Sequence, residues 1–188
     1  MTRTDDELMV RVRAGDTQAF AELYERHGAA LLTFLTRLTG DRRLGEDLLQ
    51  ETFVRVYRSR GEYQGTGRFR AFLFTIARRL VIDWRRRQNA MWLEDSEALD
   101  TLQAPERAEH RAEARDVADR VDAAIQRLPA SQREIVLLSR YAALSADEIA
   151  EVTGSTPGAV RVGLHRALRR LRELIEPDES SGAREGAR

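Results

Sequence analysis

Apolar side chains recur every three or four residues through the first 88 positions of the chain, which is the spacing of amphipathic helices. Three of these segments follow a short oxygen-bearing side chain that can cap backbone amides at a helix start: Thr4, Asp16 and Asp41. A fourth helix is predicted from about Arg68 to Gln88, after a glycine-rich loop at 59–69. Gly28 lies inside the second helix and indicates either a weak point or close packing. Residues 1–88 are therefore expected to form a compact four-helix unit.

The second half of the chain has a different pattern. Residues 89–112 are acidic and carry no sustained apolar stripe, which predicts a linker that contains one helical turn at most. Helical spacing resumes in residues 113–176, where Ser131 and Glu134 predict a capping box at the start of one helix. The polar tail 177–188 is expected to be disordered. Because no strand alternation occurs, the fold class is all-α, with two small helical domains joined by a flexible acidic linker.

The densest group of local signals lies in residues 144–174. A capping box at Ser145 starts one short helix, and Gly154 ends it because glycine accepts the left-handed conformation of a helix C-terminus. Thr156 then caps a second helix, with Pro157 in its first turn. The predicted apolar stripe of the second helix comprises Val160, Leu164, Leu168 and Leu171, and its basic residues lie off that stripe: Arg161, His165, Arg166, Arg169, Arg170 and Arg172. This combination predicts a DNA-binding helix-turn-helix, and the alternative is a helical hairpin with a solvated basic face.

The net charge of the 188-residue chain is zero, from 31 basic and 31 acidic residues, but the charges are sorted into blocks. Residues 68–87 contain seven arginines and the single acid Asp83, whereas residues 94–122 contain ten acids and four arginines. Such segregation predicts separate surfaces with separate partners. For Asp83, an ion pair with a nearby arginine is favoured over a buried acid.

Composition argues against several classes of protein. Without cysteine there is no disulfide, thiol nucleophile or cysteine-based zinc site, and His27, His110 and His165 lack ligand spacing. Without lysine there is no phosphate-binding P-loop, and no paired carboxylates suggest catalysis. The chain is therefore expected not to be an enzyme and to need no cofactor, metal or small-molecule substrate. It has neither an apolar run near the roughly 18 residues of a membrane span nor a signal peptide, so a cytoplasmic protein is expected.

The basic block is a candidate surface for single-stranded nucleic acid. Its arginines can bind phosphates, while Tyr63, Phe69 and Trp84 can stack on unpaired bases. The alternative is that Phe69 and Trp84 belong to the core; this is favoured for Phe69, and the two interpretations are even for Trp84. Since a helix-turn-helix reads duplex DNA in the major groove, the two surfaces together predict a protein that binds duplex and opened strands.

Two longer motifs resemble a known family. GEDLLQETFVRVYR followed by FRAFLFTIARRLVIDWRRR is similar to region 2 of sigma-70 transcription initiation factors, and LPASQREIVLLSRYAALSADEIAEVTGSTPGAVRVGLHRALRRLR is similar to region 4. With no region 1 or full region 3, the chain resembles the small extracytoplasmic-function (ECF) class. The resemblance implies region 2 in residues 1–88, a linker at 89–112 and region 4 in residues 113–176. It also implies three partners: core RNA polymerase, promoter DNA in duplex and single-stranded form, and an anti-sigma factor.

The resemblance also implies roles for matching positions. The residues implied to dock on core RNA polymerase are Asp47, Leu48, Gln50, Glu51 and Phe53, although a solvated helix face explains the two acids equally well. The residues implied to bind the −10 promoter element are Arg60, Tyr63, Arg68, Arg70, Arg78, Arg79, Asp83, Trp84 and Arg86. The loop at 61–67 is implied to capture a flipped base, which helps to melt the duplex. The residues implied to bind the −35 element are Thr156, Pro157, Gly158, Arg161, His165, Arg166 and Arg169.

Some positions depart from the family pattern, notably Arg79 in the basic helix and Val162 and Gly163 in the recognition helix. Because Gly163 has no side chain, its basic neighbours are expected to carry more of the −35 reading, and promoter choice is expected to differ here. The predicted function is promoter-specific transcription initiation; the alternatives are a conventional helix-turn-helix repressor or activator and a protein-interaction adaptor. With zero net charge, the free protein is expected to bind promoter duplex poorly.

Overall fold

The computed structural model describes residues 3–94 and 114–175. Eight helices and no strand occupy these residues, which confirms the all-α fold class. The helices are α1 (Asp5–Arg13), α2 (Thr17–Thr39), α3 (Arg42–Arg58), α4 (Phe69–Glu94), α5 (Ala114–Gln126), α6 (Ala130–Arg140), α7 (Ala146–Thr153) and α8 (Pro157–Ile175). In the described part of the chain, none of them has the length and apolar character that a membrane span requires.

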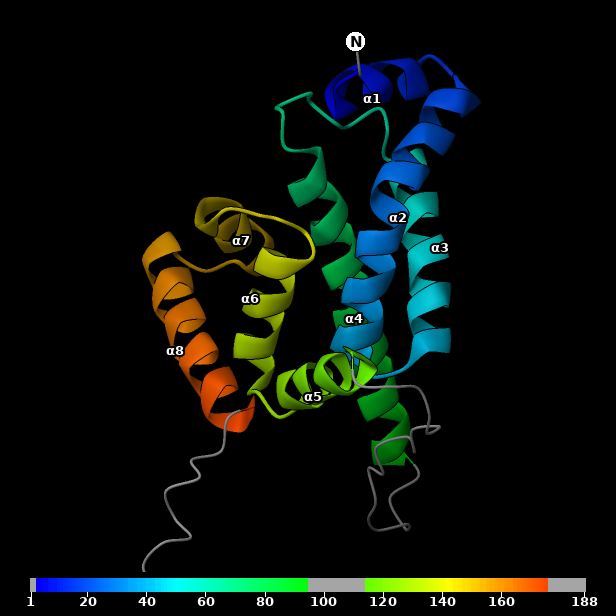
Figure 1. The fold of residues 1–188 in the computed structure, drawn as a ribbon. Coiled ribbons are helices and arrows are strands. Elements are labelled where there is room, and N and C mark those ends of the chain that lie inside the picture. Colours follow the sequence, from blue (N-terminus) through cyan, green and yellow to red (C-terminus); the bar gives the residue numbers. More distant parts are fainter. Residues whose placement is uncertain (1–2, 95–113, 176–188) are drawn as a thin grey trace, which may run out of the picture.

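The helices form two units that pack against each other (Figure 1). In the first unit α2, α3 and α4 lie side by side, and α1 covers one end. In the second unit α6 and α8 lie side by side, α7 packs against both, and α5 contacts α8. The units share an interface because α7 contacts α4 and α6 contacts α2.

Aromatic side chains fill the centre of the first unit. Phe34 of α2 and Phe74 of α4 are almost fully buried, and their rings meet edge to face with centroids 5.1 Å apart. Phe69 is also buried, so the interpretation of this residue as core is confirmed. Burial of each large apolar side chain contributes about 1.5–3 kcal/mol, and these contacts hold α4 against α2.

Local capping signals in the sequence predicted the helix starts well. Asp16 and Asp41 each accept two backbone amides at the starts of α2 and α3. Thr4 and Ser145 form the predicted capping boxes of α1 and α7, and Thr156 accepts the amide of residue 159 at 3.2 Å. The structure confirms these predictions because a cap depends on residues only two or three positions apart.

Two predicted helix boundaries were wrong. The helix α6 begins at Ala130 after Pro129 and has no side-chain cap, so Ser131 and Glu134 do not form a capping box. Glu134 instead accepts a hydrogen bond from an arginine of α4, described below. The helix α4 continues six residues beyond Gln88 to Glu94, because no proline or glycine interrupts it there. The rest of the predicted linker and the predicted disordered tail lie outside the described residues.

The buried stripe of α8 differs from the prediction at one position. Val160, Ala167 and Leu171 are buried and Leu164 is half-buried, whereas Leu168 is 54% exposed. At 3.6 residues per turn, Leu168 lies about 80° around the helix axis from Val160, and Ala167 only about 20°. The sequence favoured Leu168 because it is larger and more apolar than the alanine beside it.

Close packing of α2 and α3 depends on a glycine other than Gly28. A Cβ atom added at Gly45 would lie 2.6 Å from the side-chain oxygen of Thr36 and 3.0 Å from its backbone nitrogen. A Cβ added at Gly28 would meet only the ring of Tyr24, at an ordinary 3.6 Å. The contact between α2 and α3 therefore needs Gly45, while Gly28 costs the helix some stability without a steric reason.

These two glycines give a matched test. We expect Gly45→Ala to lower the free energy of unfolding by about 1–3 kcal/mol, because overpacking forces the two helices apart. We expect Gly28→Ala to be neutral or to stabilise by up to about 1 kcal/mol, since alanine is the better helix former. Urea unfolding of both variants measures the difference, and equal effects would contradict the packing argument.

Candidate nucleic-acid and polymerase interfaces

The helix-turn-helix consists of α7, a turn at Gly154 and α8. Gly154 has a left-handed backbone with φ 69°, as the sequence predicted. The apolar stripe of α8 faces α6 and α7, and the opposite side is exposed. Six of the seven predicted −35 residues are exposed there and Pro157 is half-buried: Thr156, Pro157, Gly158, Arg161, His165, Arg166 and Arg169. All seven residues therefore lie at the N-terminus of α8 or along its exposed side.

Gly163 does not lie on this exposed side. A Cβ atom added there would lie 2.9 Å from the Cδ1 atom of Ile135 in α6. Glycine at position 163 therefore leaves room for the tip of the Ile135 side chain between α8 and α6. The expectation that its missing side chain leaves the reading of DNA to its neighbours has no basis in this geometry, because a larger residue here would point into the protein.

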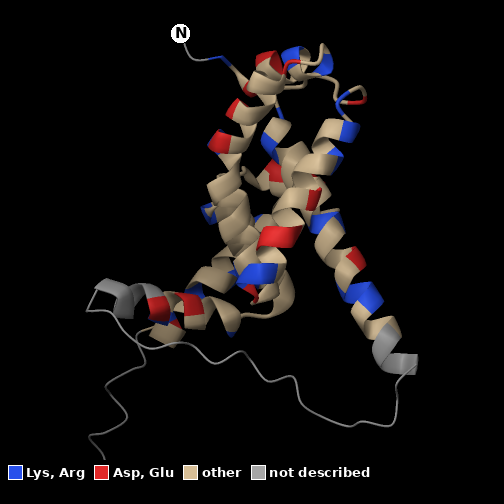
Figure 2. Cartoon of the chain, turned by 90° about the vertical axis from the view of Figure 1, so that its right-hand side faces the viewer, with Lys and Arg blue, Asp and Glu red and all other residues tan. Residues whose placement is uncertain are grey.

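A basic groove runs along α3 and α4. Two neighbouring cavities, of about 340 and 460 Å³, share Arg55 in their linings. The first is lined by Arg55, Arg58, Ser59, Glu62, Ile76 and Arg79, and the second by Arg55, Asp83, Arg86, Arg87 and Ala90. Basic positions follow α4 with Asp83 as the acid among them (Figure 2). Asp83 is exposed and lies 4.0 Å from Arg55, so the predicted ion pair is confirmed.

Arg60 and Tyr63 belong to the loop before α4, and the other predicted −10 residues divide between two sides of α4 and its start. Arg79, Asp83 and Arg86 line the basic groove, and Trp84 is half-buried. Three others, Arg68, Arg70 and Arg78, instead lie near the second unit, where each lines a pocket or forms an ion pair. The sequence missed two groove residues, Arg55 and Arg58. Their side chains join the arginines of α4 only through the packing of α3 on α4, so no local signal identified them.

The loop between α3 and α4 is held by α1. Asp6 accepts hydrogen bonds from the hydroxyl of Tyr63 and, at 2.6 Å, from the amide of Gly67. Arg13 of α1 donates to the backbone carbonyls of Arg60 and Tyr63. The predicted role of Tyr63 in stacking on a base does not fit this arrangement, because its ring is 5% exposed and packs against phenylalanines of α4. Burial and the carboxylate of Asp6 raise the pKa of the Tyr63 phenol.

Only part of the predicted polymerase-docking set is accessible on α3. Asp47 and Gln50 are exposed, and Glu51 is half-buried and accepts a hydrogen bond from Arg55 at 2.9 Å. In contrast, Leu48 and Phe53 are buried and cannot contact a partner directly in this conformation. The sequence did not single out two exposed side chains close by: Tyr24 is 42% exposed and its ring centroid lies 4.7 Å from that of Phe53, and Val54 is 41% exposed.

Among the residues that the structure describes, three ion pairs connect the two units, with nitrogen–oxygen distances of 2.7–2.8 Å: Arg78–Glu134, Arg68–Glu151 and Arg37–Asp122. We call them the clasp. Arg78 and Glu134 are the most enclosed, with 25% and 17% of their side chains exposed. Arg37 also lies 4.4 Å above the ring of Tyr141. Burial opposes ionisation of Glu148 in α7, yet hydrogen bonds from Ser145 and the charges of Arg70 and Arg68 lower its pKa. The clasp thus pairs arginines of α2 and α4 with acids of the second unit.

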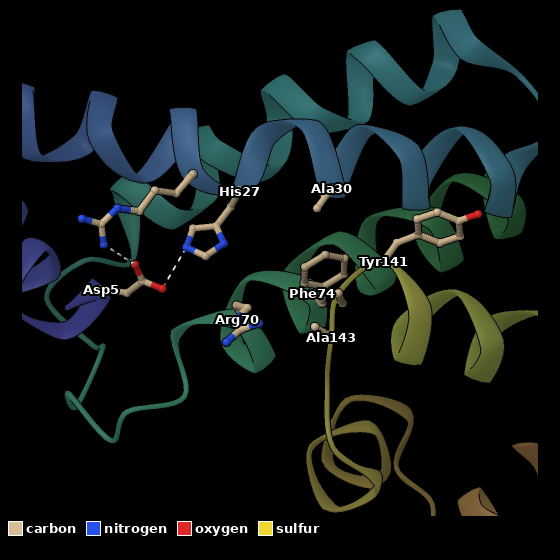
Figure 3. A pocket seen from close by; sticks show the side chains of 9 residues that line it. Asp5, His27, Ala30, Arg70, Phe74, Tyr141 and Ala143 are labelled. Atoms are coloured by element: carbon tan, nitrogen blue, oxygen red, sulfur yellow. Dashed lines mark hydrogen bonds and ion pairs between the residues drawn. The ribbon is translucent and has the colours of Figure 1, made fainter. Parts of the chain in front are cut away.

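A pocket of about 290 Å³ lies at the interface of the units (Figure 3). Asp5 accepts hydrogen bonds from Arg26 at 3.0 Å and contacts His27 at 2.8 Å, and Arg70 faces the same space. Burial lowers the pKa of His27, although Asp5 acts in the opposite direction. Tyr141 closes the pocket from the second unit. The buried imidazole and the carboxylate tie α1 to α2.

Comparison with known protein families decides the identity of these two units. The family model described as Sigma-70 region 2 matches residues 23–91, and the model described as Sigma-70, region 4 matches residues 118–171. The relative "RNA polymerase sigma factor CarQ" of Myxococcus xanthus is 37% identical over 179 residues, which cover 94% of this chain and 100% of the relative. The chain belongs to the sigma-70 family of RNA polymerase sigma factors. It is of the ECF class, as the sequence resemblance implied.

A second relative and two solved structures agree with the assignment of this chain to the sigma factor family. The "ECF RNA polymerase sigma factor ShbA" of Streptomyces griseus is 39% identical over 181 residues, covering 90% of this chain and 94% of the relative. The solved structure titled CnrH in complex with the cytosolic domain of CnrY has a TM-score of 0.70 at 26% identity, covering 93% of this chain and 98% of that one. The sigma factor RpoE from Bartonella quintana, solved with the anti-sigma factor NepR, shares the fold with a TM-score of 0.71 at 23% identity, covering 85% and 98%.

The hold of α1 on the region 2 loop of this sigma factor can be tested by amide exchange. We expect Asp6→Ala to speed hydrogen–deuterium exchange at the Gly67 amide by about tenfold or more, because a hydrogen bond to a charged group contributes about 1.5–3 kcal/mol. Tyr63→Phe removes only the hydroxyl and should leave that amide protected. Asp16→Ala, which removes the cap of α2, is the control for general loosening. Equal exchange in Asp6→Ala and wild type would contradict the role of Asp6.

The clasp of this sigma factor can be tested by charge exchange. We expect Arg78→Glu and Glu134→Arg each to separate the units and to increase the radius of gyration measured by small-angle X-ray scattering. The double variant restores an ion pair and should recover the compact value. The exposed pair Arg42–Glu46 within α3 is the matched control, since reversing it leaves the interface untouched. An unchanged radius in both single variants would show that the clasp does not hold the units together.

Proposed function

We propose that this sigma factor directs promoter-specific transcription by core RNA polymerase through three surfaces of its own. The observation that carries the proposal is the presence, in one chain, of an exposed basic recognition helix and a separate arginine-lined groove. A recognition helix suits duplex DNA, and a basic groove beside a loop suits an opened strand. The chain acts in the cytoplasm with the polymerase and binds DNA without chemistry of its own.

In this proposal, α8 places the factor on the −35 duplex. The exposed residues Arg161, His165 and Arg166 lie in the N-terminal and middle turns of α8, the part of a recognition helix that reaches base edges. Thr156, Gly158 and Pro157 surround the helix N-terminus, where backbone amides suit a phosphate. Phosphate contacts fix the register, and base-edge contacts supply the sequence preference.

The groove of α3 and α4 is the proposed path of the −10 strand. Arg79 and Arg86 supply phosphate contacts, and the cavity between Ile76 and Arg58 adjoins the loop implied to capture a base. We place the flipped base in this cavity rather than on Tyr63, because the side chain of Tyr63, although part of the loop, is buried. The exposed Asp47 and Gln50 of α3, together with the exposed Tyr24 of α2, form the proposed dock for the polymerase.

Binding of both promoter elements requires the clasp to open. The elements at −10 and −35 lie about 25 base pairs apart, roughly 80 Å along a duplex with about 3.4 Å per base pair. Helices of the two units are in direct contact in the closed arrangement, and Arg68 and Arg78 are occupied by carboxylates. The free chain should therefore bind promoter duplex weakly, and the polymerase should provide the surface that separates the units. An anti-sigma factor is the partner that would favour the closed form.

Transcription with purified components tests the proposal. We expect the chain and core RNA polymerase, without any other sigma factor, to give promoter-specific transcripts. Arg161→Ala should lower occupancy of the −35 duplex by about tenfold, since a base contact contributes about 1–3 kcal/mol. Arg79→Ala should leave that occupancy intact but reduce open-complex formation, measured by permanganate reactivity of unpaired thymines.

The alternatives give different results in the same assay. A repressor or activator would bind promoter duplex alone and yield no transcript with core polymerase, and an adaptor would do neither. Arg42→Ala, an exposed position of α3 that lies outside all three proposed surfaces, is the control. Loss of both readouts in Arg79→Ala would contradict the separate roles given to the two units.

A further inference from the structure

Val162 is an apolar residue that the core does not use. Its side chain is 51% exposed, whereas the buried stripe of α8 faces the opposite direction. At 3.6 residues per turn, Val162 lies within about 40° of Gly158 and Arg169, about 60° from His165 and roughly 160° from Val160. Val162 therefore stands at the centre of the side of α8 that region 4 offers to DNA.

The surroundings of Val162 allow close approach of another molecule. Gly158, one turn before it, has no side chain, and a Cβ atom added there would meet nothing within 4 Å. Ala159 beside it carries only a methyl group and is exposed. The long basic side chains of Arg161 and Arg166 lie on the two flanks of this line. The result is a shallow apolar site between two cations, formed by the isopropyl group of Val162.

The chemistry of the major groove offers one apolar group to such a site. Thymine presents its 5-methyl group there, while the other three bases present hydrogen-bond donors and acceptors. The isopropyl group of Val162 can neither donate nor accept a hydrogen bond, so it favours the base with the methyl group. We propose that Val162 selects a thymine in the −35 element by contact with its 5-methyl group. This inference rests on the proposed function and names the base that one residue reads.

Leu168 is the other exposed large apolar residue in the described part of α8, at 54% exposure. It lies about 120° from Val162 around the helix axis and almost two turns further toward the C-terminus. A helix-turn-helix reads bases from the N-terminal half of its recognition helix. Leu168 is therefore outside the reach of the bases and provides a matched control for removal of an exposed apolar side chain.

The experiment compares thymine with uracil, which lacks only the methyl group. A promoter library with a randomised −35 element is first selected with the holoenzyme of this chain and core RNA polymerase. Each preferred thymine is then replaced by deoxyuridine in synthetic templates, one position at a time. Promoter occupancy and transcript yield are measured for wild type, Val162→Ala, Val162→Thr and Leu168→Ala.

We expect one thymine whose replacement by uracil weakens wild-type occupancy about fourfold, the equivalent of about 0.8 kcal/mol for one methyl group removed from water. In Val162→Ala this ratio should fall close to one, because the apolar partner is largely removed. Val162→Thr keeps one methyl group and should retain part of the discrimination, and Leu168→Ala should retain all of it.

Two results would overturn the inference. One is the absence of any methyl-dependent thymine in the wild-type protein, and the other is an equal thymine-to-uracil ratio in wild type and Val162→Ala. Failure of the proposed function is a different outcome, since the wild-type holoenzyme would then select no promoter from the library. Thermal unfolding of Val162→Ala, which changes an exposed position, verifies that the variant folds.

Discussion

Burial of one side of α4 is the constraint on which the rest of this structure depends. Phe69, Leu73 and Leu80 are buried, and they fix the rotation of the helix against its neighbours. Once that rotation is set, the arginines of α4 have only two directions left. Arg79 and Arg86 point to the groove beside α3, and Arg78 points to the second unit. The arginine-lined groove and the clasp are therefore two consequences of one amphipathic helix.

The clasp and DNA compete for the same kind of interaction. A guanidinium group pairs with a carboxylate or a phosphate through similar charge-assisted hydrogen bonds. In the closed arrangement the acids of α6 and α7 satisfy Arg78 and Arg68, as phosphates would in a complex. The exposed pair Arg68–Glu151 contributes little, about 0–1 kcal/mol, so the two more enclosed pairs, Arg78–Glu134 and Arg37–Asp122, contribute most to the clasp. The structure explains part of the zero net charge, because some of the acidic residues pair with arginines where the two units meet.

The sequence predicted those features that depend on residues close along the chain. The caps at Asp16 and Asp41 and the glycine turn at 154 need no knowledge of the tertiary fold, and the structure confirms them. The errors arose where distant segments compete for a residue. Glu134 matched a capping box locally, but α6 starts one residue before Ser131 and the carboxylate binds Arg78 of the other unit. The family match secured the identity of the two regions, which helical periodicity alone did not.

The candidate sites were predictable in part for the same reason. The exposed side of α8 followed from its periodicity, whereas the groove required the packing of α3 on α4, which brings Arg55 and Arg58 beside Arg79. The ring of Tyr63 is suited to base stacking, yet it is buried in the core, and its hydroxyl donates to Asp6, which is distant in the sequence. The residue type alone does not reveal whether Tyr63 is buried or stacks on a base, because Asp6, which binds its hydroxyl, lies 57 positions earlier in the chain.

The recognition helix illustrates how packing constrains specificity. Gly163 faces Ile135 of α6, so a side chain at this position would be directed toward α6, and the tip of the Ile135 side chain would have to shift to admit it. If α8 reads the −35 element as proposed, promoter choice depends on positions whose side chains are exposed on the side away from α6, among them Val162 and His165. A change at these positions alters the surface offered to DNA without disturbing the core. The packing of α8 on α6 therefore separates positions that face the protein from exposed positions, at which the proposed −35 preference can change while the fold stays the same.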